Sequence, residues 1–220
     1  MNLKEGIAER RSIRGYLDTP VSKELLKEVI TLASRAVSAV NAQPWKFHIV
    51  TGEPLAAIRK ENLNCIEQGC PEEFEDAAVD GIYKTRRIEI AKQLYGAMEI
   101  AREDKERRTW WNNRGVNFFD APAGIIITRD KILGMSYNFD VGCVAQNLCL
   151  AAMAHGLGTC VAYQPLTYLH VLREVLGISE DEEFVCGVAI GYPDPAFAAN
   201  HVRSNRESVD KTACWYGFED

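Results

Sequence analysis

The chain has 220 residues, 47% hydrophobic and 25% charged, a composition typical of one globular domain. Its formal net charge of −6 argues against a nucleic-acid-binding protein, which usually carries a basic face. No segment approaches the roughly 20 apolar residues that cross a bilayer, and the polar start of the chain lacks the apolar core of a secretory signal, so we expect a cytoplasmic protein. The seven cysteines and four histidines show neither metal-ligand spacing nor the pattern of a disulfide framework.

Hydrophobic spacing predicts the elements of the first seventy residues. Leu25, Val29 and Leu32 recur at spacings of three to four, which is typical of an amphipathic helix of about four turns. Aromatic and β-branched residues that alternate before Gly52 predict a strand. We expect a short first helix over residues 2–11, this strand over residues 45–50 and a further helix over about residues 54–68.

Residues 70–118 differ in character from the rest of the chain, because they are charged, aromatic and helical in places. Ile88 and Leu94 belong to one apolar helical face, and a strongly charged run ends in Trp110 and Trp111. We interpret this segment as an insertion, a helical lid over an active site rather than part of the core.

The second half is predicted to mix strands and helices without a strict βαβ order. One helix is rich in glycine and alanine and is expected to pack centrally, against the sheet or a partner subunit. Trp215, Tyr216 and Phe218 near the end of the chain are expected to be buried by a neighbouring subunit. The pattern favours a single α+β layered domain over residues 1–220. Strands are expected over residues 123–128, 159–162 and 184–190, and helices over residues 138–155 and 166–176.

An arginine-rich segment near the start of the chain is the first candidate for binding chemistry. The sequence has no GxxxxGK[ST] loop and no GxGxxG turn after a first strand, so side chains would have to hold any nucleotide-like cofactor. Arginine offers a rigid fork of donors that matches phosphate oxygens. Arg10, Ser12 and Arg14 alternate, so in an extended segment they point to the same side, with Arg11 between them. A solvated basic turn is the alternative interpretation.

Two further segments carry polar groups suited to such a cofactor. Asn41 and Gln43 are amides that both donate and accept hydrogen bonds, as recognition of a flavin ring edge or its ribityl hydroxyls requires. The alternative is a polar loop between a helix and a strand. Arg203 and Arg206 lie three residues apart and suit a phosphate or the open surface equally. The sequence shows no Ser/His/Asp or Cys/His catalytic pattern, so no catalytic side chain is predicted.

Taken in order, these segments resemble one known family. An RRSIR segment is followed by an S-x-x-N-x-Q-P-W segment, a Gly-Leu-Gly turn, a strand ending in GYPD and an arginine-bearing tail. This order resembles the FMN-dependent nitroreductase family over nearly the whole chain. The pairs Arg86-Arg87 and Leu94-Tyr95, with residues 117–122, are most similar to its nitrobenzoate-reductase group. The resemblance implies an α+β layered fold with a central mixed sheet flanked by helices, in an interlocked homodimer.

The resemblance also implies that FMN binds at the interface of the two subunits. Arg14 would stabilise the negative charge that reduction places on the flavin ring. Better-known members carry a glutamate-glycine pair where this chain has Tyr163 and Gln164, so the backbone contact to the reactive ring nitrogen is left open. The implied cofactor contacts are Arg10, Arg11, Ser12, Arg14, Arg203 and Arg206 of one subunit, Ser38, Ala39, Asn41 and Gln43 of the other, and Cys160, Val161 and Ala162 beside the ring.

The activity implied by the resemblance is ping-pong reduction of nitroaromatic or quinone-like acceptors with NAD(P)H, hydride transfer being the chemistry of the flavin itself. An acceptor pocket that stacks on aromatic rings is expected, although aromatic residues at such spacing more often belong to a core. The same scaffold hosts dehalogenases, flavin-fragmenting enzymes and azoline oxidases. A flavin-binding protein without turnover and a helical interaction protein without flavin are also compatible with the sequence. The expected pocket residues are Trp110, Trp111, Phe118 and Phe119.

Overall fold

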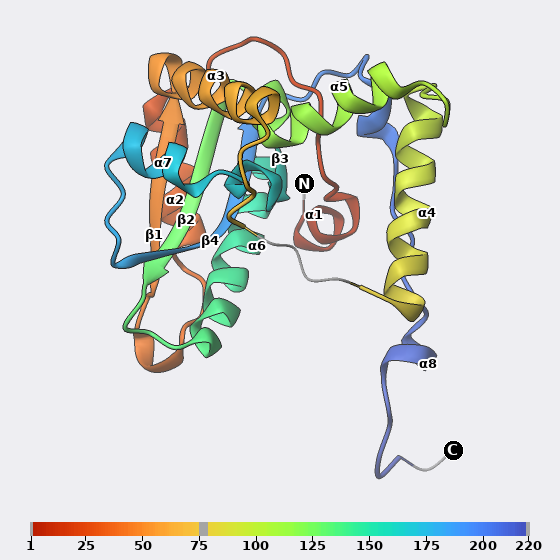
Figure 1. Cartoon of the computed structure of the whole chain (residues 1–220). Coiled ribbons are helices and arrows are strands. Elements are labelled where there is room, and N and C mark those ends of the chain that lie inside the picture. The colour runs from red at the N-terminus through yellow and green to blue at the C-terminus, as the bar shows by residue number, and fades with distance from the viewer. Residues whose placement is uncertain (1, 75–78, 219–220) are drawn as a thin grey trace.

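The computed structural model describes residues 2–74 and 79–218 and has an α+β architecture (Figure 1). The strands are β1 (Trp45–Thr51), β2 (Ala123–Asp130), β3 (Gly158–Ala162) and β4 (Glu182–Gly191). The helices are α1 (Leu3–Glu9), α2 (Lys23–Ala33), α3 (Gly52–Gln68), α4 (Gly81–Ala97), α5 (Lys105–Val116), α6 (Asn138–Ala154), α7 (Leu169–Leu176) and α8 (Val209–Thr212). Within the described residues, no helix combines the length and the apolar character needed to span a membrane.

The four strands form one sheet in the order β1-β2-β4-β3, and every neighbouring pair is antiparallel. The expectation of a mixed sheet is therefore wrong for the strands of the described chain. Parallel pairing in these residues is limited to an isolated bridge between Ser12 and Thr159. Sequence patterns could not decide the point, because side chains alternate between the faces in both kinds of strand.

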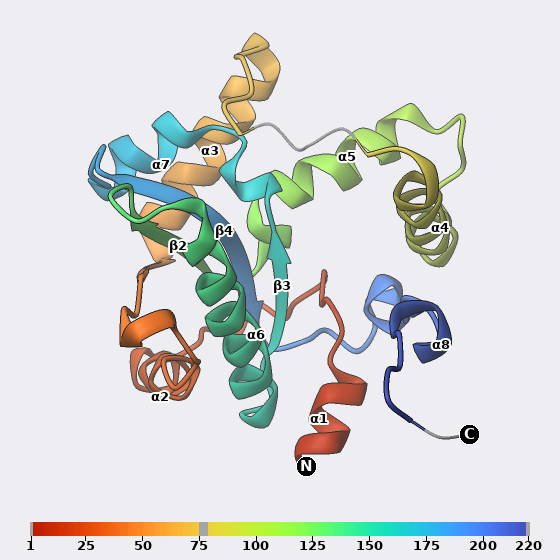
Figure 2. The same ribbon diagram turned by 90° about the horizontal axis from the view of Figure 1, so that it is seen from below.

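Helices cover both faces of the sheet (Figures 1 and 2). Ile125 and Ile127 of β2 pack in a cluster with α2 and α6, whereas Ile126 packs in a second cluster with α3 and α7. Because successive strand residues face opposite sides, the continuous apolar run of β2 contributes to two cores. The small-residue helix α6 lies against the sheet and α2, which confirms its expected central position.

Residues 81–116 stand apart from these layers. Figures 1 and 2 show α5 leading away from the sheet to α4, which lies at the side of the molecule. Leu94, Ile100 and Trp111 form a third, smaller cluster with Ala199 of the C-terminal segment. The segment predicted as an insertion over 70–118 also includes residues 75–78, which lie outside the described residues.

Glu182, at the start of β4, joins three strands through a buried carboxylate. Its Oε2 accepts hydrogen bonds from Thr128 Oγ1 (2.6 Å) and His48 Nε2 (2.7 Å), and its Oε1 pairs with Lys46. Burial alone would raise the pKa of this carboxyl group. The hydrogen bonds from Lys46, Thr128 and His48 outweigh burial and lower the pKa to about 2.

Glu182→Gln is expected to lower the free energy of unfolding by about 2 kcal/mol near pH 7. A carboxyl group with a depressed folded pKa stabilises the fold above its ordinary pKa, 4.5, and loses this contribution as the pH falls toward 2. In urea unfolding at several pH values, the difference from wild type should be largest above about pH 5 and shrink below it. Glu180→Gln, at an exposed carboxylate, is the control. A loss of stability in Glu182→Gln that does not change with pH would contradict this account.

Candidate functional site

Both ends of the chain line one cavity of about 540 Å³ beside α1, which we call the arginine cavity. Two ion pairs hold the tail between α1 and α4. Arg203 pairs with Glu9 of α1, and Arg86 of α4 pairs with Glu207 at 3.1 Å. Figure 2 shows this C-terminal segment beside α1 and α4. The residues that line the arginine cavity are Arg10, Arg11, Arg203, Arg206, Ile7, Ala8, Gln146 and Ser204.

The positive charge in the arginine cavity is only partly balanced. Arg203 has an acidic partner, whereas Arg10, Arg11 and Arg206 form no ion pair with the described residues. Arg206 instead donates to the hydroxyl (2.8 Å) and the carbonyl (3.2 Å) of Ser204. In a chain with a net charge of −6, guanidinium groups gathered in this way offer donors that suit an anion, and their fork geometry matches phosphate oxygens.

Asn200 fixes the arginine-rich segment from the C-terminal side. This residue is 2% exposed, and its Oδ1 accepts hydrogen bonds from the backbone N–H groups of Arg14 (2.7 Å) and Gly15 (3.1 Å). Its Nδ2 donates to the carbonyls of Gly15 (2.8 Å) and Asp194 (3.0 Å), and its own carbonyl accepts from Arg11 Nε (2.5 Å). Both donors and the acceptor of the amide are therefore used. Sequence reasoning missed Asn200, because no pattern in the tail distinguishes a buried asparagine from an exposed one.

The arginine-rich segment runs along the outer edge of β3. The N–H of Ile13 donates to the carbonyl of Thr159 (2.9 Å), beside the bridge that Ser12 makes. A Cβ atom on Gly158 would stand 2.6 Å from the Ile13 side chain, so only glycine permits this close crossing. Ile13 is buried whereas Ser12 and Arg14 are half-buried, which is the alternation expected of an extended segment.

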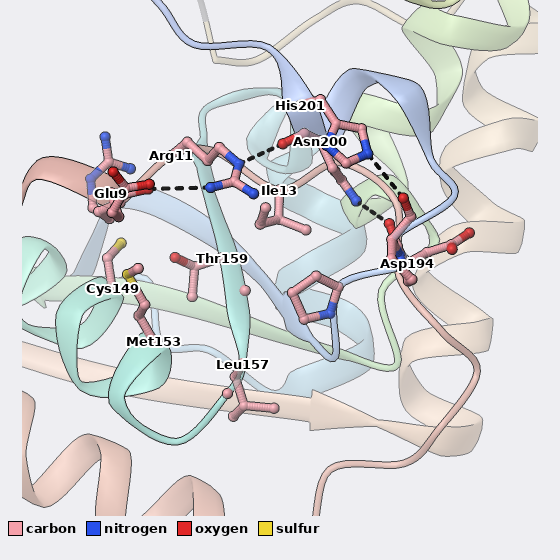
Figure 3. Close-up of a pocket in the computed structure, with 15 residues that line it drawn as sticks. Glu9, Arg11, Ile13, Cys149, Met153, Leu157, Thr159, Asp194, Asn200 and His201 are labelled. Atoms are coloured by element: carbon pink, nitrogen blue, oxygen red, sulfur yellow. Dashed lines mark hydrogen bonds between the residues drawn. The ribbon is translucent and has the colours of Figure 1, made fainter. Parts of the chain in front are cut away.

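A smaller cavity of about 280 Å³ opens beside this crossing (Figure 3). Arg10 and Arg11 line both this cavity and the arginine cavity, so the two are adjacent. Figure 3 shows Arg11 on one side of the cavity, with Cys149 and Met153 on another and Thr159 between them. Burial raises the pKa of the Cys149 thiol, so this side chain contributes a neutral, apolar wall.

Arg14 lines a different hollow of about 630 Å³, which we call the wide cavity. Its guanidinium lies 5.8 Å from the ring centroid of Phe119. Phe74 and Tyr163 form a stacked pair on another wall, with centroids 5.4 Å apart and an interplanar angle of 14°. Flat aromatic faces next to a guanidinium suit a planar, electron-poor ring. The strand wall of the wide cavity consists of Cys160, Val161 and Ala162.

A strained turn carries Phe119 into the wide cavity. Phe118, Phe119 and Asp120 have φ values of 57°, 52° and 60°, in the left-handed region that side chains other than glycine disfavour. Arg114 holds the turn, because its Nε donates to Asp120 Oδ2 (2.6 Å) and its Nη2 to the carbonyl of Phe119 (3.0 Å). Arg59 donates to backbone carbonyls on both sides of the turn. These bonds offset the backbone strain.

Arg114→Gln is expected to lower the free energy of unfolding by about 3 kcal/mol, because it removes the ion pair with Asp120 and the charge-assisted hydrogen bond to Phe119 and leaves only Arg59 as a charged donor to the strained turn. Urea unfolding near pH 7 measures the effect. Arg102→Gln removes an exposed guanidinium that makes no hydrogen bond with the described residues, and it should change stability by less than about 0.5 kcal/mol. Equal stability of the two variants would show that Arg114 does not hold the turn.

The model of the nitroreductase family matches residues 7–192 of this chain. The chain belongs to the nitroreductase family. The resemblance expected from the sequence is thus confirmed for the family and for the α+β fold.

Two relatives and one solved structure of this family are similar over nearly their whole length. The 4-nitrobenzoate reductase of Pseudomonas putida is 32% identical over 217 residues, covering 97% of this chain and 95% of that protein. The nitrobenzene nitroreductase of Ectopseudomonas oleovorans is 33% identical, with 93% and 92% coverage. The structure of the FMN and NADPH-dependent nitroreductase NfnB from Sphigopyxis sp. strain HMH gives a TM-score of 0.93 at 30% identity, covering 99% of this chain and 100% of the other.

The four aromatic residues predicted for the acceptor pocket separate in the structure. Phe118 and Phe119 are both buried in the cluster with α3 and α7, and Phe119 also lines the wide cavity. Trp111 is buried in the third cluster and stacks on Phe197, with centroids 6.4 Å apart. Trp110 is 44% exposed and does not line the wide cavity. The structure of a single chain therefore brings only Phe119 to this cavity.

The amide-bearing turn lies at the opposite edge and end of the sheet from the arginine-rich segment. It precedes β1, one edge strand, whereas that segment borders β3, the other edge strand. In the sheet register Thr159 is level with Thr51, at the far end of β1 from Trp45. One chain therefore does not bring this turn to either the arginine cavity or the wide cavity. The predicted residues of the turn are Ser38, Ala39, Asn41 and Gln43, and the last three are exposed.

Proposed function

We propose that this chain is an FMN-dependent NAD(P)H oxidoreductase that reduces nitroaromatic or quinone-like acceptors. The observation that carries the proposal is the gathering of Arg10, Arg11, Arg203 and Arg206 around one cavity, next to the aromatic wide cavity that Arg14 lines. A flavin phosphate carries close to two negative charges and needs several cations in a protein of net charge −6. The family, and the activities for which the relatives are named, support the same chemistry.

The residues present fit FMN from its phosphate to its ring. Arg10, Arg11, Arg203 and Arg206 would hold the phosphate, and Ser12 would donate to the ribityl chain. Arg14 would lie at the ring, where its fixed positive charge stabilises the negative charge of the reduced form. Residues 160–162 of β3 would border the ring. When bound, the flavin supplies the hydride chemistry, and the side chains bind it, orient it and shape the acceptor site.

A homodimer completes this proposal. The amides of Asn41 and Gln43 lie at the other end of the sheet, so a second copy would have to supply them to the flavin of the first. The tail supports this arrangement, since Trp215, Tyr216 and Phe218 are 64%, 84% and 73% exposed in one chain. Aromatic residues exposed in this way mark an interaction surface. The helical lid formed by the 70–118 segment and the cytoplasmic location stay predictions.

Titration of the purified chain with FMN tests the function. We expect flavin fluorescence to change with saturation at one FMN per chain, and the visible flavin absorbance to bleach when NADH or NADPH is added without oxygen. Addition of 4-nitrobenzoate or a benzoquinone should then restore the absorbance. A chain that takes up FMN but is not bleached by either nucleotide is a flavin-binding protein without turnover, and a chain that takes up no FMN refutes the proposal.

A further inference from the structure

Four of the six arginines in residues 81–116 are occupied by contacts with the described residues. Arg107 donates to the carbonyls of Met98 (2.7 Å) and Glu99 (2.8 Å), where α4 ends. Arg108 lies 4.3 Å from the ring centroid of Tyr95. Arg86 and Arg114 form ion pairs with Glu207 and Asp120.

Arg87 differs from these neighbours. It lines the wide cavity, and it makes no hydrogen bond or ion pair with the described residues. Ile90, one helical turn later, lines the same cavity, so α4 presents a cationic and an apolar group side by side. The stacked rings of Phe74 and Tyr163 also line the cavity. Among the described residues that line the cavity, Glu72 carries the acidic group.

We infer that Arg87 is a subsite for an anionic substituent on the aromatic acceptor, and that it makes carboxylated acceptors better substrates than their neutral counterparts. This inference rests on the proposed function, in which Arg14 is committed to the flavin ring. Among the described residues of the wide cavity, Arg87 is then the cation that is left for a second ligand. The aromatic walls hold the ring of the acceptor, and the guanidinium fork receives its carboxylate.

The charges around the cavity predict that neutralising Arg87 weakens the binding of a carboxylated acceptor and that neutralising Glu72 strengthens it. A carboxylate that reaches Arg87 gains a charge-assisted hydrogen bond, which is absent for an amide of the same shape. Glu72 repels the same carboxylate, so its neutralisation should improve binding. An uncharged acceptor should be nearly indifferent to both changes.

Steady-state kinetics of the FMN-loaded enzyme with 4-nitrobenzoate and 4-nitrobenzamide test the inference at saturating NAD(P)H. Arg87→Gln is expected to raise KM for 4-nitrobenzoate about tenfold, with kcat nearly unchanged, and KM for 4-nitrobenzamide less than about twofold. Arg87→Lys should show an intermediate effect, since it keeps the charge without the fork. Glu72→Gln should lower KM for 4-nitrobenzoate about twofold to fivefold.

Lys92→Gln is the matched control, because it removes an exposed charge from α4 at a residue that does not line the cavity. A similar change for both acceptors in Arg87→Gln overturns the inference. An effect confined to the reaction with NADPH also overturns it and assigns Arg87 to the nucleotide phosphate. In either case the variant still takes up FMN and is bleached by reductant, so the proposed function stands. A wild-type chain that takes up no FMN overturns both proposals.

Discussion

Replacement of both Arg10 and Arg206 by glutamine is expected to raise the Kd for FMN by about 100-fold or more, because each charge-assisted hydrogen bond contributes about 1.5–3 kcal/mol. The two side chains come from opposite ends of the chain and line the same cavity, and neither has an acidic partner among the described residues. They are therefore available to a phosphate. Fluorescence titration with FMN measures the loss, and a fall in the apparent affinity of wild type with rising salt should accompany it.

The matched control for this prediction is the double variant Lys4→Gln/Lys211→Gln. It removes one positive charge near each end of the chain, at residues that do not line the arginine cavity. Because the change in net charge is the same, this variant should bind FMN within about threefold of wild type. Equal weakening in both double variants would mean that overall charge, rather than the arginine cavity, holds the phosphate.

Asn200→Ala is expected to lower the free energy of unfolding by about 3 kcal/mol, since it leaves two backbone N–H groups without their acceptor and removes one of the hydrogen bonds to each of two carbonyls. These groups belong to Arg14, Gly15 and Asp194. The variant should also bind FMN weakly at temperatures where it is still folded, because the backbone that carries Arg14 is no longer fixed. Urea unfolding and FMN titration measure the two effects.

Asn205→Ala changes an exposed asparagine of the same tail and serves as the control for stability. It should change the free energy of unfolding by less than about 0.5 kcal/mol. If Asn200→Ala unfolds at the same urea concentration as wild type, then the hydrogen bonds of Asn200 contribute little to joining the two ends of the chain.

Local patterns located the elements of the fold but not their pairing. The alternation before Gly52 and the apolar run at the start of β2 each predicted a strand. Burial of one face of a strand leaves an alternation of apolar and polar residues, and burial of both faces leaves a continuous apolar run. The strand order and the antiparallel pairing depend on contacts between distant segments, so no local period records them. For the same reason, only the family resemblance brought Arg10 and Arg206 to one site.

Aromatic residues show where sequence reasoning fails. Phe118 and Phe119 are neighbours of the same type and are buried in the same core, yet the left-handed turn brings only Phe119 of the two to the wide cavity. Trp111 is of a residue type that is common in binding pockets, yet it is buried in the third cluster. Burial of such side chains depends on what packs over them, and a residue type alone does not contain that information.

The hydrogen bonds of Asn200 also set an order of events during synthesis. The last strand of the sheet ends at Gly191. The hydrogen bonds that fix the arginine-rich segment form only after Asn200 has been made, and the arginine cavity gains its last guanidinium only with Arg206. A chain still attached to the ribosome, with these residues inside the exit tunnel, has its first arginines and no closed anion site. Cofactor uptake therefore belongs to the period after residue 206 has left the tunnel, when the two distant segments are free to meet.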